Sequence, residues 1–131
     1  MMRKPRKGWN SGAAAVELAL VLPVFITFVF GILNLGWAMY CGAEVRHAVE
    51  RSTRLLIKDP TTSASTILTN VKSQLSAADP SAVTLTKTTQ AVGTGGGIAK
   101  LSWTYAYTLT SPFMASKTFH FDSSMVVPLR Y

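Results

Sequence analysis

The chain has 131 residues, 48% of them hydrophobic, with thirteen basic and six acidic side chains. That length is enough for one small domain in addition to a membrane helix. The net charge of +7 would suit nucleic-acid binding, but four of the basic residues lie in the first seven positions, and residues 13–131 hold only nine basic against six acidic side chains. Cys41 is the single cysteine, which excludes an intramolecular disulfide.

A short basic leader, residues 1–12, precedes a long apolar run. No charged residue occurs between Leu18 and Ala43, and a helix of that length spans roughly 39 Å, more than the ~30 Å of hydrocarbon in a bilayer. We therefore expect a transmembrane helix over residues 13–43, because a cleaved secretory signal has a much shorter apolar region. The positive leader predicts a cytoplasmic N-terminus and an extracytoplasmic domain over residues 44–131.

Within the predicted span, Pro23 removes one backbone hydrogen bond and is expected to kink the helix. Asn34 is the strongly polar side chain in the middle of the run. It either seeks a partner across a helix interface or lies near the outer headgroups. Trp37 and Tyr40 mark the outer interface, where aromatic rings are enriched.

The helix is predicted to continue past the membrane, from Ala13 to Lys58, and to end at Asp59-Pro60. An i,i+4 ion pair between Glu50 and Arg54 is expected on its polar side. Helical spacing after residue 44 defines an apolar stripe that must pack on the outer domain; it consists of Val45, Ala48, Val49, Ser52, Leu55 and Leu56.

A second helix is predicted over Thr61–Ala78, capped by Thr61 or Thr62 and closed by Asp79-Pro80. After it the hydrophobic period changes from 3.6 to 2, which favours strands. The strongest signal is a run of alternate apolar positions, namely Ala99, Leu101, Trp103, Tyr105, Tyr107 and Leu109. Val83 and Leu85 indicate an earlier strand, and residues 119–129 suggest one or two short ones. We predict an α+β fold, with one or two helices on one face of an antiparallel sheet of three or four strands.

The sequence offers little that points to chemistry. His47 and His120 lack the further ligands of a metal site, and the Gly93–Gly97 stretch lacks the Lys-Ser/Thr of a phosphate-binding loop. The aromatic side chains of residues 103–107 could stack nucleic-acid bases, but at period 2 they suit the core face of a sheet better. We expect no enzyme, no metal, no cofactor and no small-molecule substrate, and we regard nucleic acid as an unfavoured partner.

Glu17 is the exception, because an ionisable residue at the edge of a membrane helix is costly to bury and is a functional candidate by default. The alternative is a first-turn glutamate that is stabilised by the helix dipole, with its carboxylate among the headgroups. Its position five residues after Gly12 favours the functional interpretation.

The stretch Gly12-Ala-Ala-Ala-Val-Glu-Leu-Ala-Leu-Val-Leu-Pro23, preceded by the basic leader, resembles the type IV prepilin signal. In more detail it is similar to the N-terminus of TadE-like proteins, which are minor pilins or pseudopilins of the tight-adherence (Flp-type) pilus system. TadF-like and TadG-like proteins share this pattern. Leu18 stands where many prepilins have Phe.

The resemblance implies a pilin-like fold and a substrate rather than an enzyme. A membrane prepilin peptidase would cut between Gly12 and Ala13, and Glu17 would then pair with the new α-amino group of its own or a neighbouring subunit. The partners would be that peptidase, other pilins or pseudopilins and the inner-membrane assembly proteins, in a pilus for surface attachment and biofilm formation. The alternative is an uncleaved single-span anchor whose outer domain binds a partner or nucleic acid.

Overall fold

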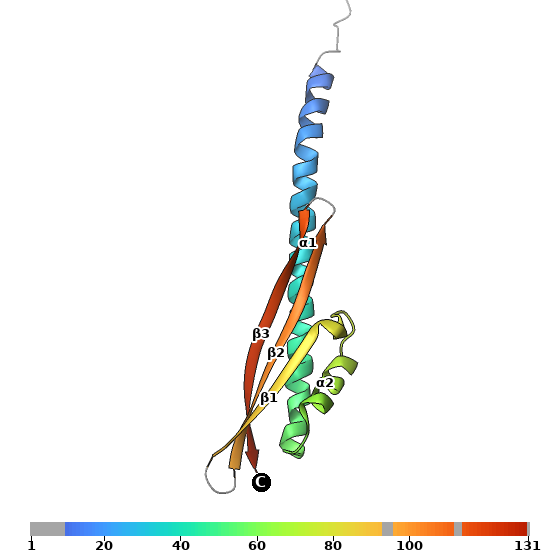
Figure 1. The fold of residues 1–131 in the computed structure, drawn as a ribbon. Helices are drawn as coiled ribbons and strands as arrows, with labels where there is room; N and C mark the ends of the chain where they lie inside the picture. Colours follow the sequence, from blue (N-terminus) through green and yellow to red (C-terminus); the bar gives the residue numbers. More distant parts are fainter. Residues whose placement is uncertain (1–9, 93–95, 112–113, 131) are drawn as a thin grey trace, which may run out of the picture. The chain divides into compact units, whose positions relative to one another are not determined.

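The computed structural model describes residues 10–92, 96–111 and 114–130, so most of the predicted leader lies outside the described residues. The chain divides into two compact units, Met1–Leu35 and Gly36–Tyr131. Helix α1, Asn10–Lys58, contributes to both units. The second unit also holds α2 and three strands (Figure 1). The predicted long helix is confirmed, including its end at Lys58 before Asp59-Pro60.

The part of α1 in the first unit has exposed apolar side chains at almost every position. Among the described residues, α1 is the helix that is long and apolar enough to cross a membrane. Pro23 lies inside α1, and the helix continues through it although Pro23 has no N–H to donate. Thr27 Oγ1 donates to the Pro23 carbonyl at 2.8 Å. The predicted kink at Pro23 remains a prediction.

The sheet of the second unit has the order β1-β2-β3 and is antiparallel throughout. Its strands are β1, Val83–Ala91, β2, Gly96–Ser111, and β3, Met114–Arg130. The α+β class is therefore confirmed, with three strands in the described residues. Residues 119–129 do not form one or two short strands, because β3 is a single long strand. Its proline, Pro128, is tolerated because β3 lies at the sheet edge, where an N–H is not needed.

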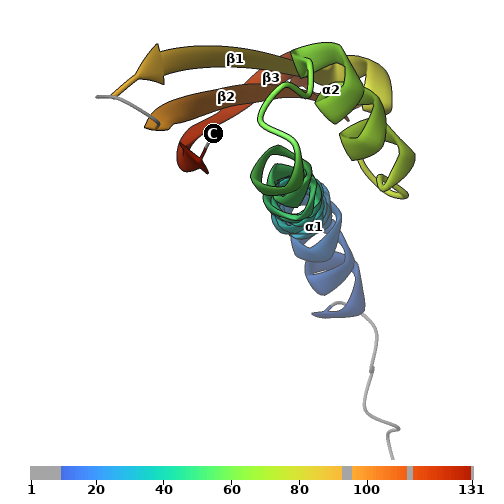
Figure 2. The same cartoon turned by 90° about the horizontal axis from the view of Figure 1, so that it is seen from below.

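One face of α1 packs on the sheet and on α2, Ala64–Ser73 (Figure 2). The predicted stripe is confirmed, since five of its six side chains are buried and Leu55 is half-buried. Trp103 and Tyr105 on β2 are also buried, which confirms that this aromatic face belongs to the core. Burial of apolar surface of this kind contributes about 25 cal/mol per Å². The buried core consists of Cys41, Val45, Ala48, Val49, Leu56, Ile67, Val71, Ala78, Val83, Ala99, Leu101, Trp103, Tyr105, Val127 and Leu129.

The predicted bounds of the second helix, Thr61–Ala78, are wrong at both ends. Ser63 is the N-cap, and its side chain accepts from the Thr66 amide. Thr61 and Thr62 do not cap it, because the Thr61 amide and hydroxyl both donate to the Asp59 carboxylate, at 2.9 and 2.6 Å. This local turn competes with a helix start. The helix ends at Ser73, because the Glu44 carboxylate on α1 accepts hydrogen bonds from the amides of residues 76–78.

Two polar contacts fix the helices to each other and to the sheet. Ser52 on α1 is fully buried, and its Oγ lies 2.9 Å from Asn70 Oδ1 on α2. Lys87 on β1 points to the core side, where its Nζ donates to the Pro60 and Thr62 carbonyls at 3.1 and 2.7 Å. A buried polar group is tolerated when it is hydrogen-bonded, so these contacts let polar residues occupy positions in the apolar patterns.

Candidate functional site at the N-terminal turn of the long helix

The predicted scissile bond, Gly12–Ala13, lies in the first turn of α1. Both residues are exposed, and a Cβ built at Gly12 would meet no described atom within 4 Å. The bond is therefore open on the surface of the chain. The side chains on either side of the bond are small.

Cleavage of this bond requires the first helical turn to unwind. In helical geometry the Gly12 carbonyl accepts a hydrogen bond from the amide of Val16, and a peptidase has to expose that carbonyl to an attacking water. The first four amides of a helix have no intrahelical partner, and glycine costs about 1 kcal/mol relative to alanine in a helix. Gly12 thus sits where the helix is easiest to open.

Glu17 lies four residues after Ala13, so the two share one face of α1, one turn apart. A helical side chain is tilted toward the helix N-terminus, which directs the Glu17 carboxylate toward Ala13. Its side chain is exposed, and within the residues that the structure describes it has no ion-pair partner. If Ala13 became the first residue, its ammonium and this carboxylate would be within reach of each other.

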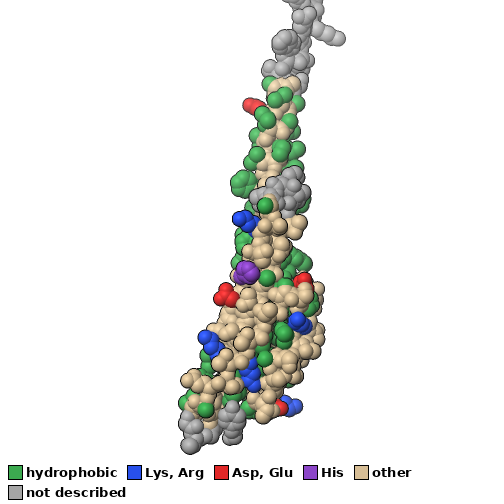
Figure 3. All heavy atoms as spheres, in the orientation of Figure 1, with side chains coloured by type: hydrophobic (Ala, Val, Ile, Leu, Met, Phe, Trp, Pro, Cys, Tyr) green, Lys and Arg blue, Asp and Glu red, His purple; other side chains and the backbone are tan. Residues whose placement is uncertain are grey.

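The bare part of α1 runs from Leu18 to Trp37, because Ala38 is the first helix residue buried by the outer domain. Those 20 positions make about 30 Å of helix, which matches the hydrocarbon thickness of a bilayer. Hydrophobic side chains cover this part in the view of Figure 3. Trp37 and Tyr40 are both exposed at its end, with ring centroids 5.6 Å apart, as expected for an interfacial aromatic pair.

The bare helix carries one shallow notch, at Gly31, lined also by Thr27, Phe28, Ile32 and Leu35. Asn34 Nδ2 donates to the Phe30 carbonyl of the same helix at 2.8 Å, which satisfies one of the hydrogen-bonding groups of its amide. Among the described residues, nothing covers the apolar surface on the other sides of the helix, which makes it a surface for lipid or for other helices.

Glu44, which sequence analysis missed, is the first charged residue after the apolar run. Its carboxylate accepts hydrogen bonds from the amides of Ser76, Ala77 and Ala78 at 2.8, 3.0 and 2.8 Å, and from the Ser76 hydroxyl at 2.6 Å. Desolvation alone would raise the pKa of Glu44, but these hydrogen bonds outweigh it and lower the pKa to about 2. The only sign of this contact in the sequence is the position of Glu44 directly after the predicted span.

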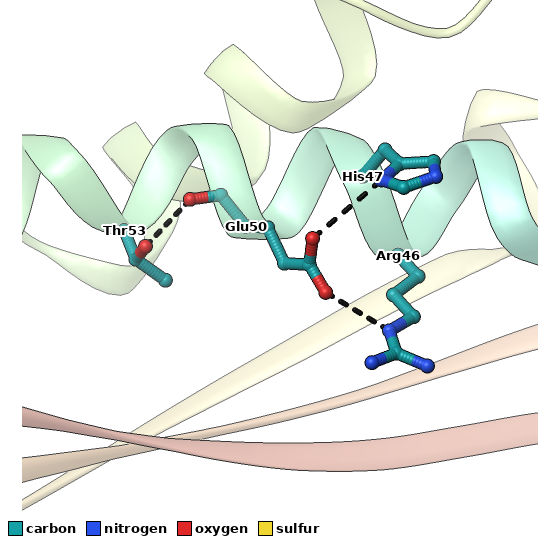
Figure 4. A network of polar contacts seen from close by, with 4 residues as sticks. All are labelled: Arg46, His47, Glu50 and Thr53. Carbon is teal, nitrogen blue, oxygen red and sulfur yellow. Dashed lines mark hydrogen bonds and ion pairs between the residues drawn. The ribbon is translucent and has the colours of Figure 1, made fainter.

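The predicted ion pair between Glu50 and Arg54 is wrong. Glu50 pairs instead with Arg46, at 2.9 Å from Nε to Oε1, and with His47, at 3.5 Å from Nδ1 to Oε2 (Figure 4). Arg46 lies one turn before Glu50 and reaches it along the helix surface, which leaves Arg54 exposed.

His47 is therefore an exposed partner of Glu50. His120 is exposed on β3, opposite Ala106 in the register. Among the described residues no three His, Cys, Asp or Glu side chains gather as metal ligands would.

Residues 12–54 match the family model described as TadE-like protein. The match begins at Gly12 and covers the bare helix and most of the helix face that packs on the sheet. No significant match to the chain was found among curated proteins. The solved structures gave no significant match either.

Proposed function

We propose that this chain, whose residues 12–54 are TadE-like, is a minor pilin or pseudopilin of a tight-adherence pilus system. The observation that carries the proposal is the family match beginning at Gly12, followed by a bare apolar helix with Glu17 at its start. The chain is a substrate in this scheme and not an enzyme. A prepilin peptidase removes residues 1–12 and leaves Ala13 as the first residue.

Cleavage changes the charge of the N-terminus. It separates the basic leader from the helix and creates an ammonium at Ala13, one turn from the Glu17 carboxylate. In a low-dielectric setting, a pair of this kind sets the register between helices as much as it stabilises them. The Glu17 carboxylate pairs with the Ala13 ammonium of its own or of a neighbouring subunit.

The bare helix then supplies the surface for assembly. In the membrane, lipid covers Leu18–Trp37, and in a fibre or at its base the helices of other subunits take the place of lipid. The exchange costs little because both environments are apolar. Before processing, the positive leader keeps the N-terminus in the cytoplasm and places the α+β domain outside it.

The proposal is tested by complementing a strain that lacks this gene with the wild-type chain or with Gly12→Leu. Leucine at the cleavage position blocks the peptidase without touching the domain, because nothing described lies near Gly12. The variant is expected in the membrane at normal abundance, with pili and surface attachment lost. Normal attachment by cells that hold only Gly12→Leu would favour an uncleaved anchor instead.

A further inference from the structure

A line of basic side chains runs along the side of α1 that faces away from the sheet. His47, Arg51, Arg54 and Lys58 follow one another at the spacing i, i+4, i+7 and i+11, and all four are exposed. The side chains at 45, 49, 52 and 56, on the opposite side of the same turns, are fully buried. We call these four residues the basic stripe.

Three of the five acidic residues of the domain are engaged away from the stripe. Glu44 accepts three backbone amides, and the Asp59 and Asp79 carboxylates accept from the amides of Thr61 and Ser81. These bonds use the negative charge to stabilise turns.

Glu50 is the acidic neighbour of the stripe, and it is paired with Arg46 and His47. Within the described part of the chain, Arg51, Arg54 and Lys58 therefore have no salt-bridge partner. The stripe presents three permanent positive charges and one histidine to whatever lies beside the helix.

We propose that the basic stripe is a docking surface for an acidic helix of a different protein. The charges follow the helix axis for about 16 Å, so a partner that meets all of them must run alongside α1. Glutamates on a second helix at the same i, i+4, i+7 and i+11 spacing would face His47 and the three permanent cations in turn. The inference goes beyond the proposed function and does not depend on cleavage at Gly12.

The same charges argue against a second copy of this chain at this face. Two basic stripes placed side by side repel each other, and juxtaposed like charges disfavour a wrong partner. The exposed acidic side chain of the sheet, Asp122 on β3, has no acidic neighbour on its strand, so the domain offers no acidic row to match the stripe. The stripe thus selects a partner other than itself.

The test uses the full chain in phosphatidylcholine nanodiscs and a fluorescent 20-residue helical peptide with glutamates at i, i+4, i+7 and i+11. A second peptide has the same composition but its glutamates distributed around the helix. The first peptide is expected to bind at least five-fold tighter than the second, and its binding should weaken as salt rises from 50 to 300 mM. Equal affinity for the two peptides would overturn the proposal.

Variants locate the binding surface. Arg51→Glu combined with Arg54→Glu is expected to weaken binding at least ten-fold, and the neutral pair Arg51→Gln and Arg54→Gln to weaken it three-fold or more. Lys100→Glu combined with Lys117→Glu is the matched control, because both lysines are exposed, on β2 and β3, and lie off the stripe; its effect should be below two-fold. Near-UV circular dichroism verifies that each variant keeps the packing of Trp103.

Two other ligands serve as competing outcomes. A 20-base-pair DNA duplex and nanodiscs containing phosphatidylglycerol are compared at the same salt. If either binds as tightly as the acidic helix and loses affinity equally in the Arg51/Arg54 variants, the stripe recognises any polyanion and the proposal is wrong. An equal loss in the control that combines Lys100→Glu with Lys117→Glu would also contradict it, since that result would reflect net charge alone.

Discussion

The Glu44 carboxylate and the Ala78 amide, 34 positions apart in the sequence, are joined by a hydrogen bond of 2.8 Å. The amides of Ser76 and Ala77 donate to the same carboxylate. One side chain of α1 therefore holds the segment that leads from α2 into β1. Since Glu44 follows the apolar run directly, the domain is fastened to the helix at the point where the predicted span ends.

Glu44→Gln is expected to lower the free energy of unfolding of the domain. The glutamine amide presents an N–H₂ group to backbone N–H donors that need an acceptor, and a charge-assisted hydrogen bond contributes about 1.5–3 kcal/mol. Because the carboxylate is partly open to solvent, we expect a loss of about 1–2 kcal/mol. Thermal unfolding of the full chain in detergent, followed by near-UV circular dichroism, measures it, and an unchanged midpoint would show that the contact is not stabilising.

The same contact predicts a dependence on pH. The pKa of Glu44 falls from its ordinary value of 4.5 to about 2 in the folded chain. A lowered carboxyl pKa contributes stability that is present above pH 4.5 and is lost as the pH falls from 4.5 toward 2. Wild type and Glu44→Gln should therefore differ most at neutral pH and converge near pH 2, as unfolding at a series of pH values will show. A constant difference across that range would contradict the lowered pKa.

Gly42 is predicted to be intolerant of a large side chain. A Cβ at this position would lie 3.1 Å from Phe121 Cδ1 on β3, so Gly42→Leu must displace β3 or its aromatic ring. Overpacking of this kind costs about 1–3 kcal/mol. Gly36→Leu is the matched control, because nothing described lies within 4 Å of a Cβ there. Urea or thermal unfolding should find the first variant destabilised relative to the second, and equal effects would refute the close packing.

Lys87→Met tests the ammonium that holds the turn between α1 and α2. Without Nζ, the Pro60 and Thr62 carbonyls lose their shared donor, and we expect about 1–2 kcal/mol of destabilisation. Lys100→Met is the control, since Lys100 lies exposed on β2. Thermal midpoints of the two variants decide the question, and a stable Lys87→Met chain would mean that water replaces the ammonium fully.

The long helix could be predicted because an uncharged apolar run, Leu18 to Ala43, leads directly into an apolar stripe of helical spacing that ends before Asp59-Pro60. The alternation in residues 99–109 predicted β2 and its buried face. The predicted second helix is too long at its C-terminal end, because the Glu44 carboxylate binds the amide of Ser76, which lies 32 positions later in the sequence. Spacing alone does not identify the partner of Glu50, because Arg46 and Arg54 both lie one turn away from it. Side-chain packing in the folded chain determines that Arg46 forms the pair.

The Glu17 carboxylate gives a prediction about assembly that is separate from cleavage. Glu17→Gln keeps the size of the side chain and removes the charge that would pair with the Ala13 ammonium. We expect this variant to be processed normally but to assemble poorly, with pili reduced at least ten-fold by electron microscopy. Glu17→Asp should retain part of the function, and wild-type assembly by Glu17→Gln would exclude the pairing role even if cleavage occurs.

The central claim is that the bond between Gly12 and Ala13 is cut. The most direct measurement is the intact mass of the chain purified from membranes of cells with and without an active prepilin peptidase. With the peptidase, the mass should fall by the mass of residues 1–12 and the first residue should be Ala13, whereas Gly12→Leu should retain the full 14.2 kDa. A full-length wild-type chain in cells with an active peptidase would contradict the account.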